Sequence, residues 1–363
     1  MKILIISNAY PTKKNPADGT FVKDQVESIR KESKKIKLTV FYNPIFDLIE
    51  KPVYKKGILW ISIKYIIFCL FFIPYFFKRY DLIHCHQCVF PAILGVIYKK
   101  IKKIPLIITS HGGDLITTNK KMITLKKKVF NQADKIIAVS DYYREGLIKK
   151  FNVKENNIET ISCGVNLKLF KPKKSKKAIK KNLGISPNKF LILFAGHLID
   201  LKNPLVLLKA LKILNSGKVE AAIIGDGPLK DKLIEYTKKN QLKVKFLPYM
   251  KHESITKWMQ ASDLFVFPSK EDALGLVGIE ALASGTPVIA SRVGGKVEYI
   301  KEGINGEFFQ FDDEKELSEK IKKYLKSDYY NKLQKNSFSS VSRFSMEKIA
   351  KKMINEYKKT EKK

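Results

Sequence analysis

The sequence predicts an α/β protein built from two doubly wound domains with parallel sheets. Short apolar runs of strand length recur along the whole chain, and loops rich in Gly, Pro, Asn or Asp separate them from helices. With 363 residues, 45% of them hydrophobic, the chain is long enough to form two such domains with buried cores.

Each predicted strand is an apolar run bounded by turn residues. In the first half of the chain these runs are Lys2–Ser7, Lys37–Tyr42, Asp81–Cys85, Pro105–Ser110, Lys135–Ser140 and Glu159–Cys163. In the second half they are Phe190–Ala195, Ala221–Gly225, Val244–Leu247, Leu264–Phe267 and Val288–Ala290. Helices are predicted over 20–31 and 276–284.

A Lys- and Ser-rich run, residues 171–182, predicts a linker between the domains. The first domain then comprises residues 1–170 and the second comprises residues 183–343. The remaining tail, residues 344–363, is amphipathic and predicts a last helix.

The net charge of +34 comes mostly from lysine, because 64 of the 69 basic residues are Lys and five are Arg. Proteins that read bases favour the two-pronged guanidinium of Arg, so this charge does not indicate a nucleic-acid partner. Compositional bias and attraction to an anionic membrane surface both explain it. Four cysteines make no disulfide framework, and the N-terminal run is a strand rather than a signal peptide, which favours the cytosol.

The most hydrophobic segment, residues 57–77, resembles a transmembrane span. Lys64 interrupts it and Pro74 breaks it, and the charge-free run of 13 residues from Tyr65 to Phe77 falls short of the roughly 20 that a span needs. We therefore expect a helix that is partly core and partly a shallow membrane-contact face.

The run His84-Cys85-His86-Gln87-Cys88 suggests a metal site. Alternation places His84 and His86 on one face of a strand, but a closed zinc site needs four ligands and the chain has no second cluster. No metal is therefore expected, and the sequence leaves open whether the two histidines contact substrate or have a structural role.

Residues 268–291 carry the most specific chemistry. They form a strand end, a loop, a short helix and the next strand, and ligands bind at the carboxyl ends of such strands. Gly275 lets a ligand approach the main chain, and the first helix amides, Leu276 and Val277, form an anion site suited to a diphosphate. Glu280 lies among apolar residues and needs a partner, such as the hydroxyls of a ribose, while Asp272 or its loop can meet a sugar.

This stretch closely resembles the donor-site signature of the family 4 retaining glycosyltransferases. The family pattern is an acidic residue, seven residues, then Glu-Ala-x-Ala-x-Gly-x-Pro-Val, which here runs from Asp272 through Glu280 to Val288. Family members usually have Glu at the first acidic position, so either Asp272 or the neighbouring Glu271 plays that role.

The resemblance implies the GT-B fold, with two Rossmann-like domains facing across a cleft. The first domain would bind the acceptor and the second the nucleotide sugar, and the last helix would cross back to the first.

Other loops resemble the same family in the first domain. His111-Gly112-Gly113-Asp114 is similar to its His-Gly-x-Asp or Glu, which implies that His111 lies by the donor sugar and that Asp114 organises the loop. Gly19 corresponds to the glycine of its first loop, near the donor phosphates.

In the second domain, Lys202 fits the lysine that clamps the diphosphate. His197 stands where the family usually has Arg, and a neutral imidazole cannot reproduce the grip of a guanidinium. The turn that begins at Gly225 resembles the family's Gly-x-Gly-Pro near the nucleotide.

The resemblance implies transfer of a sugar from a nucleoside diphosphate sugar to an acceptor hydroxyl, with retention at the anomeric carbon. Lys202, His197 and the helix amides would stabilise the leaving phosphate, while Asp272 would bind the sugar. No Asp-x-Asp occurs, so neither a metal nor another cofactor is expected. The charge and segment 57–77 favour a lipid-linked or cell-surface glycan acceptor at the cytoplasmic face of a membrane.

Three other functions remain open. A GT-B nucleotide-sugar epimerase would act without an acceptor, and a phosphorylase would need free phosphate. A non-catalytic basic protein at the membrane would show no stabilisation by nucleotides.

Overall fold

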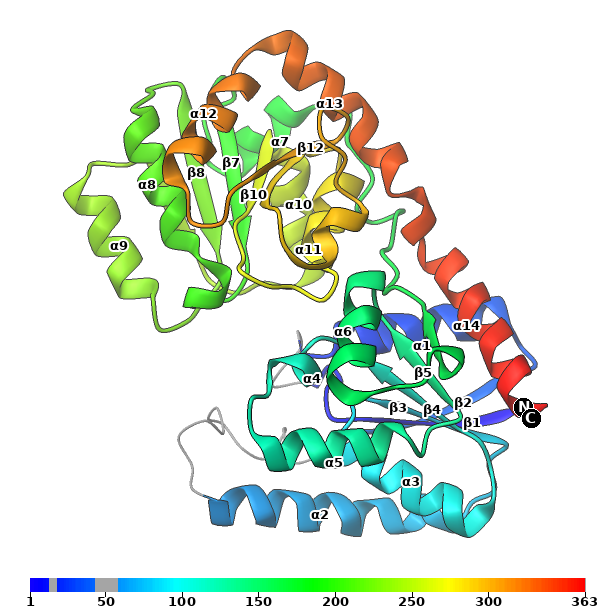
Figure 1. Ribbon diagram of the computed structural model, residues 1–363. Helices are drawn as coiled ribbons and strands as arrows, with labels where there is room; N and C mark the ends of the chain where they lie inside the picture. Colours follow the sequence, from blue (N-terminus) through cyan, green and yellow to red (C-terminus); the bar gives the residue numbers. More distant parts are fainter. Residues whose placement is uncertain (13–17, 43–57, 363) are drawn as a thin grey trace. The chain divides into compact units, whose positions relative to one another are not determined.

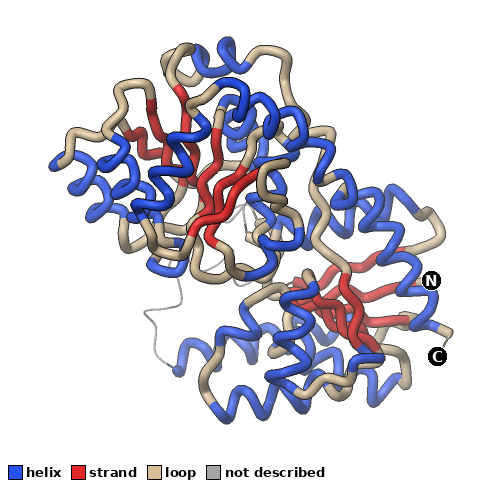
Figure 2. The backbone as a smooth tube through the Cα atoms, turned by 45° about the horizontal axis from the view of Figure 1, so that its top comes forward, coloured by secondary structure: helices blue, strands red, loops and turns tan. Residues whose placement is uncertain are grey.

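The computed structural model describes residues 1–12, 18–42 and 58–362, and the chain forms two compact units (Figure 1). Unit 1 comprises Met1–Gly164 and Met346–Lys363, and unit 2 comprises Val165–Ser345. Each unit has one parallel sheet with helices on both faces (Figure 2). The predicted α/β class with two parallel sheets is confirmed.

The sheet of unit 1 has the strand order β2-β1-β3-β4-β5-β6, and every neighbouring pair is parallel. The strands are β1 (Lys2–Ser7), β2 (Lys37–Tyr42), β3 (Leu82–His86), β4 (Leu106–Ser110), β5 (Lys135–Ala138) and β6 (Ile158–Thr160). The helices are α1 (Thr20–Glu32), α2 (Ile58–Phe76), α3 (Phe90–Lys102), α4 (Gly113–Ile116), α5 (Lys120–Phe130), α6 (Asp141–Phe151), the 3₁₀ turn η3 (Glu155–Asn157) and α14 (Met346–Glu361).

The last helix belongs to the core of unit 1. Ile349, Met353 and Tyr357 of α14 pack with Val26 of α1 and Ile5 of β1 in one buried cluster. Helices α2, α3 and α5 cover the other face of the sheet (Figure 1).

The sheet of unit 2 has the order β12-β11-β10-β7-β8-β9 and is also parallel. Its strands are β7 (Phe190–Ala195), β8 (Val219–Ile224), β9 (Val244–Leu247), β10 (Leu264–Phe267), β11 (Val288–Ser291) and β12 (Gly306–Phe309). Its helices are α7 (Lys176–Asn182), α8 (Pro204–Leu214), α9 (Lys230–Lys239), α10 (His252–Ala261), α11 (Leu276–Ala283), α12 (Glu314–Tyr324) and α13 (Ser327–Ser340), with 3₁₀ turns η4 (Asp200–Lys202), η5 (Gly294–Glu298) and η6 (Ser342–Phe344).

The strand order reverses once in each sheet. In unit 1 the chain moves outward from β1 to β2 and then returns to place β3 on the other side of β1. In unit 2 the same reversal separates β7 from β10. Loops at the carboxyl ends of strands beside such a switch point are the usual ligand sites of open α/β sheets.

Two expectations from the sequence differ from the structure. The run 171–182 contains helix α7, whose first turn is capped by Ser175 and whose Lys180 is buried in an ion pair with Asp263, so the lysines there do not form a plain linker. Pro74 does not break α2, which continues to Phe76. Pro74 removes one i→i−4 hydrogen bond, and only two more residues follow it in the helix, so most of α2 precedes the proline.

Helix α2 bears on the membrane expectation. Its first residue is Ile58, so Gly57 of the predicted segment lies outside the described residues. None of the helices described here, α2 included, is long and apolar enough to cross a bilayer.

Candidate functional site

An ion pair lies at the switch point of unit 2. Lys202, in the η4 turn after β7, donates a hydrogen bond from Nζ to Oδ1 of Asp272 over 2.6 Å. Ser269 holds the other carboxylate oxygen, Oδ2, through its hydroxyl. Among the described residues Asp272, rather than the neighbouring Glu271, thus faces Lys202. The two residues that the sequence associated with a phosphate and a sugar are therefore in direct contact.

A second lysine, which the sequence reasoning missed, lies beneath this ion pair. Lys296 in η5 is fully buried, and its Nζ donates to the carbonyl oxygen of Ser269 at 2.7 Å, to the Ser269 hydroxyl at 2.9 Å and to the Ser291 hydroxyl at 2.8 Å. Burial lowers the pKa of Lys296 to about 7, Asp272 opposes the shift and Lys202 adds to it. The signal in the sequence was a lysine between glycine and valine, five residues after the end of a buried strand.

The first turn of α11 follows from the conformation of Gly275. This residue has φ 78° and ψ 56° and precedes Leu276. A Cβ at this position would lie 2.6 Å from Cε1 of Phe267, so both the backbone angle and the space require glycine. Tyr299 donates from its hydroxyl to the Gly275 carbonyl at 2.9 Å. Leu276 and Val277, the predicted anion-binding amides, therefore begin a helix whose N-terminus is fixed in place.

Glu280 is buried inside α11, with 6% of its surface exposed. Nε2 of His252, at the start of α10, lies 3.8 Å from Oε1 of Glu280. The carboxylate thus has a nearby polar group in the protein, which the sequence did not predict because His252 lies 28 residues before Glu280 in the chain.

His197 and Gly225 lie on the loops after two neighbouring strands, β7 and β8. The side chain of His197 is exposed, and its ring centroid is 6.2 Å from that of Tyr249. A Cβ on Gly225 would lie 1.9 Å from the carbonyl oxygen of Gly196, so the two loops pack backbone against backbone. Glycine at 225 therefore sets the position of the loop that carries His197.

In unit 1, His111 follows β4 and stacks on His86 of β3. The ring planes are 12° apart, with centroids 5.0 Å apart, and Nε2 of His111 lies 2.8 Å from Nδ1 of His86. Burial lowers the pKa of His111 to about 3, and burial with neighbouring histidines holds the pKa of His86 well below its ordinary value. Both rings are neutral at physiological pH.

Asp114 is a buried anchor of the loop after β4. Its Oδ2 accepts a hydrogen bond from Ser110 at 2.5 Å, and its Oδ1 lies 3.1 Å from Nζ of Lys126. Lys126 also donates to the Asp114 backbone carbonyl at 3.0 Å. A carboxylate with these partners orders the chain around His111 rather than reaching outward.

Next to His111 there is a pocket of about 540 Å³. Its lining residues are Asn8, Phe21, Gln87, Val89, Phe90, His111, Gly113, Asp114, Thr117, Met122 and Lys126. Gly19, which the sequence assigned to the site, starts α1 at φ 65°, and a Cβ there would lie 2.2 Å from the Ala9 backbone. Residues 13–17 of its loop lie outside the described residues.

In the histidine-cysteine run on β3, His84 is held by hydrogen bonds within the protein. Nδ1 of His84 lies 2.8 Å from the Tyr357 hydroxyl, and Nε2 lies 2.6 Å from the Thr109 hydroxyl, so hydrogen bonds occupy both ring nitrogens. Within the described part of the chain, no three His, Cys, Asp or Glu side chains are grouped to hold a metal ion.

Known proteins resemble this chain in sequence and in fold. A family model for glycosyl transferases group 1 matches residues 175–361, and one for glycosyltransferase family 4 matches residues 36–169. An uncharacterised glycosyltransferase of Methanocaldococcus jannaschii is 28% identical over 77% of this chain and 75% of its own length. A D-inositol 3-phosphate glycosyltransferase of Catenulispora acidiphila is 31% identical over 62% of this chain, although the match covers only 58% of that relative.

Among solved structures, HepE of Anabaena in complex with UDP and glucose has a TM-score of 0.79 and 21% identity, with 99% of both chains covered. At this identity the similarity shows the fold, and it confirms the predicted GT-B class of two parallel α/β units. The group 1 model covers more than half of the sequence. The chain belongs to the group 1 glycosyltransferases.

Proposed function

We propose that this glycosyltransferase transfers a sugar from a nucleoside diphosphate sugar to an acceptor hydroxyl with retention at the anomeric carbon. The observation that supports this most directly is the contact between Lys202 and Asp272 at the switch point of unit 2, beside β7 and β10. A cation for a diphosphate and a carboxylate for sugar hydroxyls lie within one hydrogen bond of each other. HepE, which shares the fold, has been solved with UDP and with UDP-glucose.

In this proposal unit 2 holds the donor and unit 1 holds the acceptor. The bond between the anomeric carbon and the diphosphate oxygen breaks, and a bond to the acceptor oxygen forms on the same face. The acceptor proton passes to the leaving phosphate oxygen, so no side chain acts as the base. Lys202 and the amides of Leu276 and Val277 stabilise the developing phosphate charge without a metal ion.

A ligand panel tests the donor class. The purified protein is melted with UDP, GDP, ADP, CMP or phosphate, and a ligand at a hundred times its dissociation constant should stabilise it by about 2.7 kcal/mol. Glu280→Ala should abolish the shift given by the one effective nucleotide, whereas Glu319→Ala, on the exposed face of α12, should leave it unchanged. No shift with any nucleoside diphosphate would contradict the proposal.

Product analysis separates the proposed reaction from its alternatives. Sugar transfer needs both a nucleotide sugar and an acceptor, and the product must keep the anomeric configuration of the donor. Conversion of the donor alone would indicate an epimerase, and dependence on free phosphate would indicate a phosphorylase.

We further propose a lipid-linked or cell-surface glycan acceptor, reached from the cytoplasmic face of a membrane. On α2, the side chains of Ile66, Leu70, Phe71 and Ile73, together with Phe77 just after it, are 49% to 76% exposed. Lys102 lies 5.1 Å above the ring of Phe76, and Lys78 lies 5.4 Å above that of Tyr75. Apolar side chains with lysines at their edge suit the surface of an anionic bilayer.

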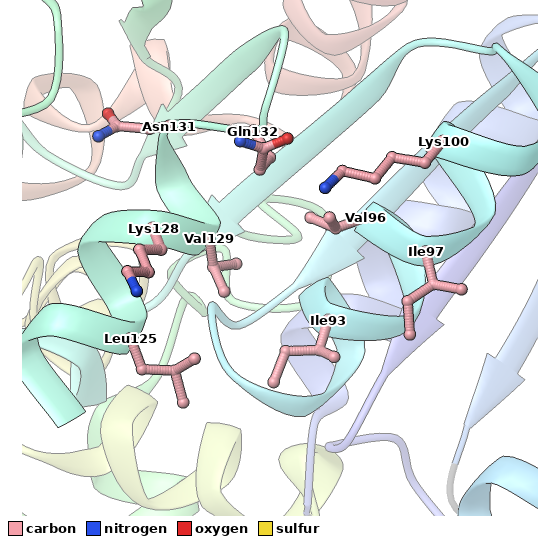
Figure 3. A pocket seen from close by; sticks show the side chains of 9 residues that line it. All are labelled: Ile93, Val96, Ile97, Lys100, Leu125, Lys128, Val129, Asn131 and Gln132. Carbon is pink, nitrogen blue, oxygen red and sulfur yellow. The ribbon is translucent and has the colours of Figure 1, made fainter. Parts of the chain in front are cut away.

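A groove between α3 and α5 adds to this surface. It has a volume of about 530 Å³ and is lined by Ile93, Val96, Ile97, Lys100, Leu125, Lys128, Val129, Asn131 and Gln132. Figure 3 shows its aliphatic side chains facing each other between the two helices, with Lys100 and Lys128 on opposite sides. An acyl chain fits the aliphatic part, and the lysines suit a phosphate at its end. Residues 66–113 have six basic residues and one acidic residue.

Vesicle co-sedimentation tests this part of the proposal. The protein should bind vesicles that contain anionic phospholipid and not vesicles of phosphatidylcholine alone. Leu70→Glu should weaken binding, whereas Ile213→Glu, at a residue of unit 2 that is 49% exposed, should not. Equal binding by the two variants would contradict a contact through α2.

A further inference from the structure

Three histidines of unit 1 lie in a row that ends at His111. The centroids of His84 and His86 are 4.4 Å apart, and those of His86 and His111 are 5.0 Å apart. Burial lowers the pKa of His84 and of His111 to about 3 and that of His86 well below the ordinary value. Each ring is therefore neutral and has one N–H, so the location of that proton decides what each ring can do.

The first ring of the row, His84, has a hydroxyl partner at each of its two nitrogens. Its nitrogens face the Tyr357 hydroxyl at 2.8 Å and the Thr109 hydroxyl at 2.6 Å. Hydroxyl groups both donate and accept, so His84 is satisfied in either tautomer. His84 therefore does not determine the tautomers of His86 and His111, which depend on the contacts of those two rings.

The 2.8 Å contact between Nδ1 of His86 and Nε2 of His111 permits two arrangements. In the first, His86 donates from Nδ1 and His111 has its proton on Nδ1. In the second, His111 donates from Nε2 and His86 has its proton on its own Nε2.

The environment of Nε2, the other ring nitrogen of His86, decides between the two proton arrangements. Nε2 of His86 is buried and has no hydrogen-bond partner in the part of the chain that the structure describes. A proton there would be a buried donor without an acceptor, and orphaned buried N–H groups are rarer in proteins than bare acceptors. The first arrangement leaves only an empty lone pair at this atom.

We propose that His86 is a positioning residue that holds His111 in the tautomer protonated at Nδ1. His111 then has one ring nitrogen left for a ligand, and that nitrogen is a hydrogen-bond donor. Its neighbour in the structure is the Sγ atom of Cys163 at 3.9 Å, a weak acceptor that an oxygen of a ligand can replace. His111 would thus donate to a sugar oxygen and could not remove a proton from one, a role that rests on the proposed glycosyl transfer.

The tautomer can be measured without any substrate. The chain has five histidines, so two-dimensional NMR of protein labelled with ¹⁵N at histidine gives a spectrum that single substitutions can assign. The wild-type protein should show His111 with its proton on Nδ1 and His86 with its proton on Nδ1. A proton on Nε2 of His111 would overturn the proposal, whether or not the protein transfers sugar.

Two substitutions of His86 then connect the tautomer to turnover. The amide of His86→Asn can place a donor where Nδ1 was, so His111 should keep its proton on Nδ1 and kcat should stay within a few-fold of wild type. His86→Leu fills the space without a donor, so His111 should lose the fixed tautomer and kcat should fall about tenfold with little change in KM, which corresponds to one lost hydrogen bond. Equal losses in the two variants would show that His86 serves only packing.

The outcomes also separate this inference from the proposed function. The fixed tautomer without sugar transfer would leave the positioning role standing and remove the proposed reaction. Sugar transfer by a protein in which the His111 tautomer is mobile or reversed would support the proposed reaction and remove the positioning role of His86.

Discussion

Nζ of Lys202 lies 2.6 Å from Oδ1 of Asp272, which joins the turn after β7 to the loop after β10. Each of these two groups is also the best candidate to hold one half of a nucleotide sugar. In the proposed reaction a donor diphosphate competes with the Asp272 carboxylate for Lys202, and a weaker ion pair leaves the carboxylate more available to hydroxyl groups. The ion pair thus predicts different effects for substitutions of Lys202 and of Asp272.

Lys202→Ala should reduce turnover by about two to three orders of magnitude, because in the proposed reaction this charge stabilises the leaving phosphate in the transition state. Lys209→Ala is the matched control, since Lys209 of α8 also faces a carboxylate, that of Glu314 at 3.6 Å. Its turnover should equal that of the wild type. Initial rates at saturating donor measure both variants, and near wild-type turnover in Lys202→Ala would remove this lysine from the mechanism.

Asp272→Asn should strengthen the binding of a free nucleotide and weaken sugar transfer. The substitution frees Lys202 from its carboxylate, so a free nucleoside diphosphate should bind several-fold more tightly, while sugar transfer should fall because the sugar loses a charged acceptor. Calorimetry with the nucleotide that stabilises the wild type, together with initial rates, measures the two effects. Weaker nucleotide binding in this variant would show that Asp272 helps to hold the nucleotide itself.

The strands were largely predictable from the sequence. The predicted runs Lys2–Ser7, Lys37–Tyr42, Phe190–Ala195 and Val244–Leu247 match β1, β2, β7 and β9 residue for residue. Each is an apolar segment between turn residues, so local composition is sufficient. Helix α7 was missed because a run rich in lysine is typical of a solvated linker, whereas in the fold Lys180 pairs with Asp263, which lies 83 residues away.

The candidate site was predictable only in part, and lysines show why. Lys126 belongs to a run of three lysines that looks solvated, yet it is buried against Asp114 of the His111 loop. Lys296 is buried beneath the Lys202–Asp272 pair. In a chain with 64 lysines, composition cannot distinguish a surface lysine from one whose partner comes from another loop. The types of residue near the signature could be predicted from the sequence, but the residues that they contact could be identified only from the fold.

Lys296 should make stability depend on pH. Burial lowers its pKa in the folded protein to about 7, below the ordinary value of 10.5. Between these pH values the unfolded chain binds more protons than the folded protein, so the free energy of unfolding rises with pH, by about 2 kcal/mol from pH 7 to 9. Below pH 7 both states are protonated and this contribution is flat.

Lys296→Met isolates the effect. Urea titrations of both proteins at pH 6 to 9 should give a difference, wild type minus variant, that rises between pH 7 and 9. The buried tyrosines have raised pKa values and ionise above this range in the folded protein, so they do not affect the comparison. A constant difference would show that Lys296 stays charged in the fold.

Gly275→Ala tests whether the conformation before α11 supports nucleotide binding. Gly275 and Gly303 both lie in unit 2 and have nearly the same φ, 78° and 68°. A Cβ at 275 would lie 2.6 Å from Phe267, whereas a Cβ at 303 would meet nothing within 4 Å. Gly303→Ala should therefore lose only about 1 kcal/mol for the left-handed backbone. Gly275→Ala should lose more and should also reduce the thermal shift caused by the nucleotide, because the amides of Leu276 and Val277 must move. If the two variants lose equal stability and keep the full nucleotide shift, the glycine at 275 serves the backbone alone and the start of α11 is not part of the donor site.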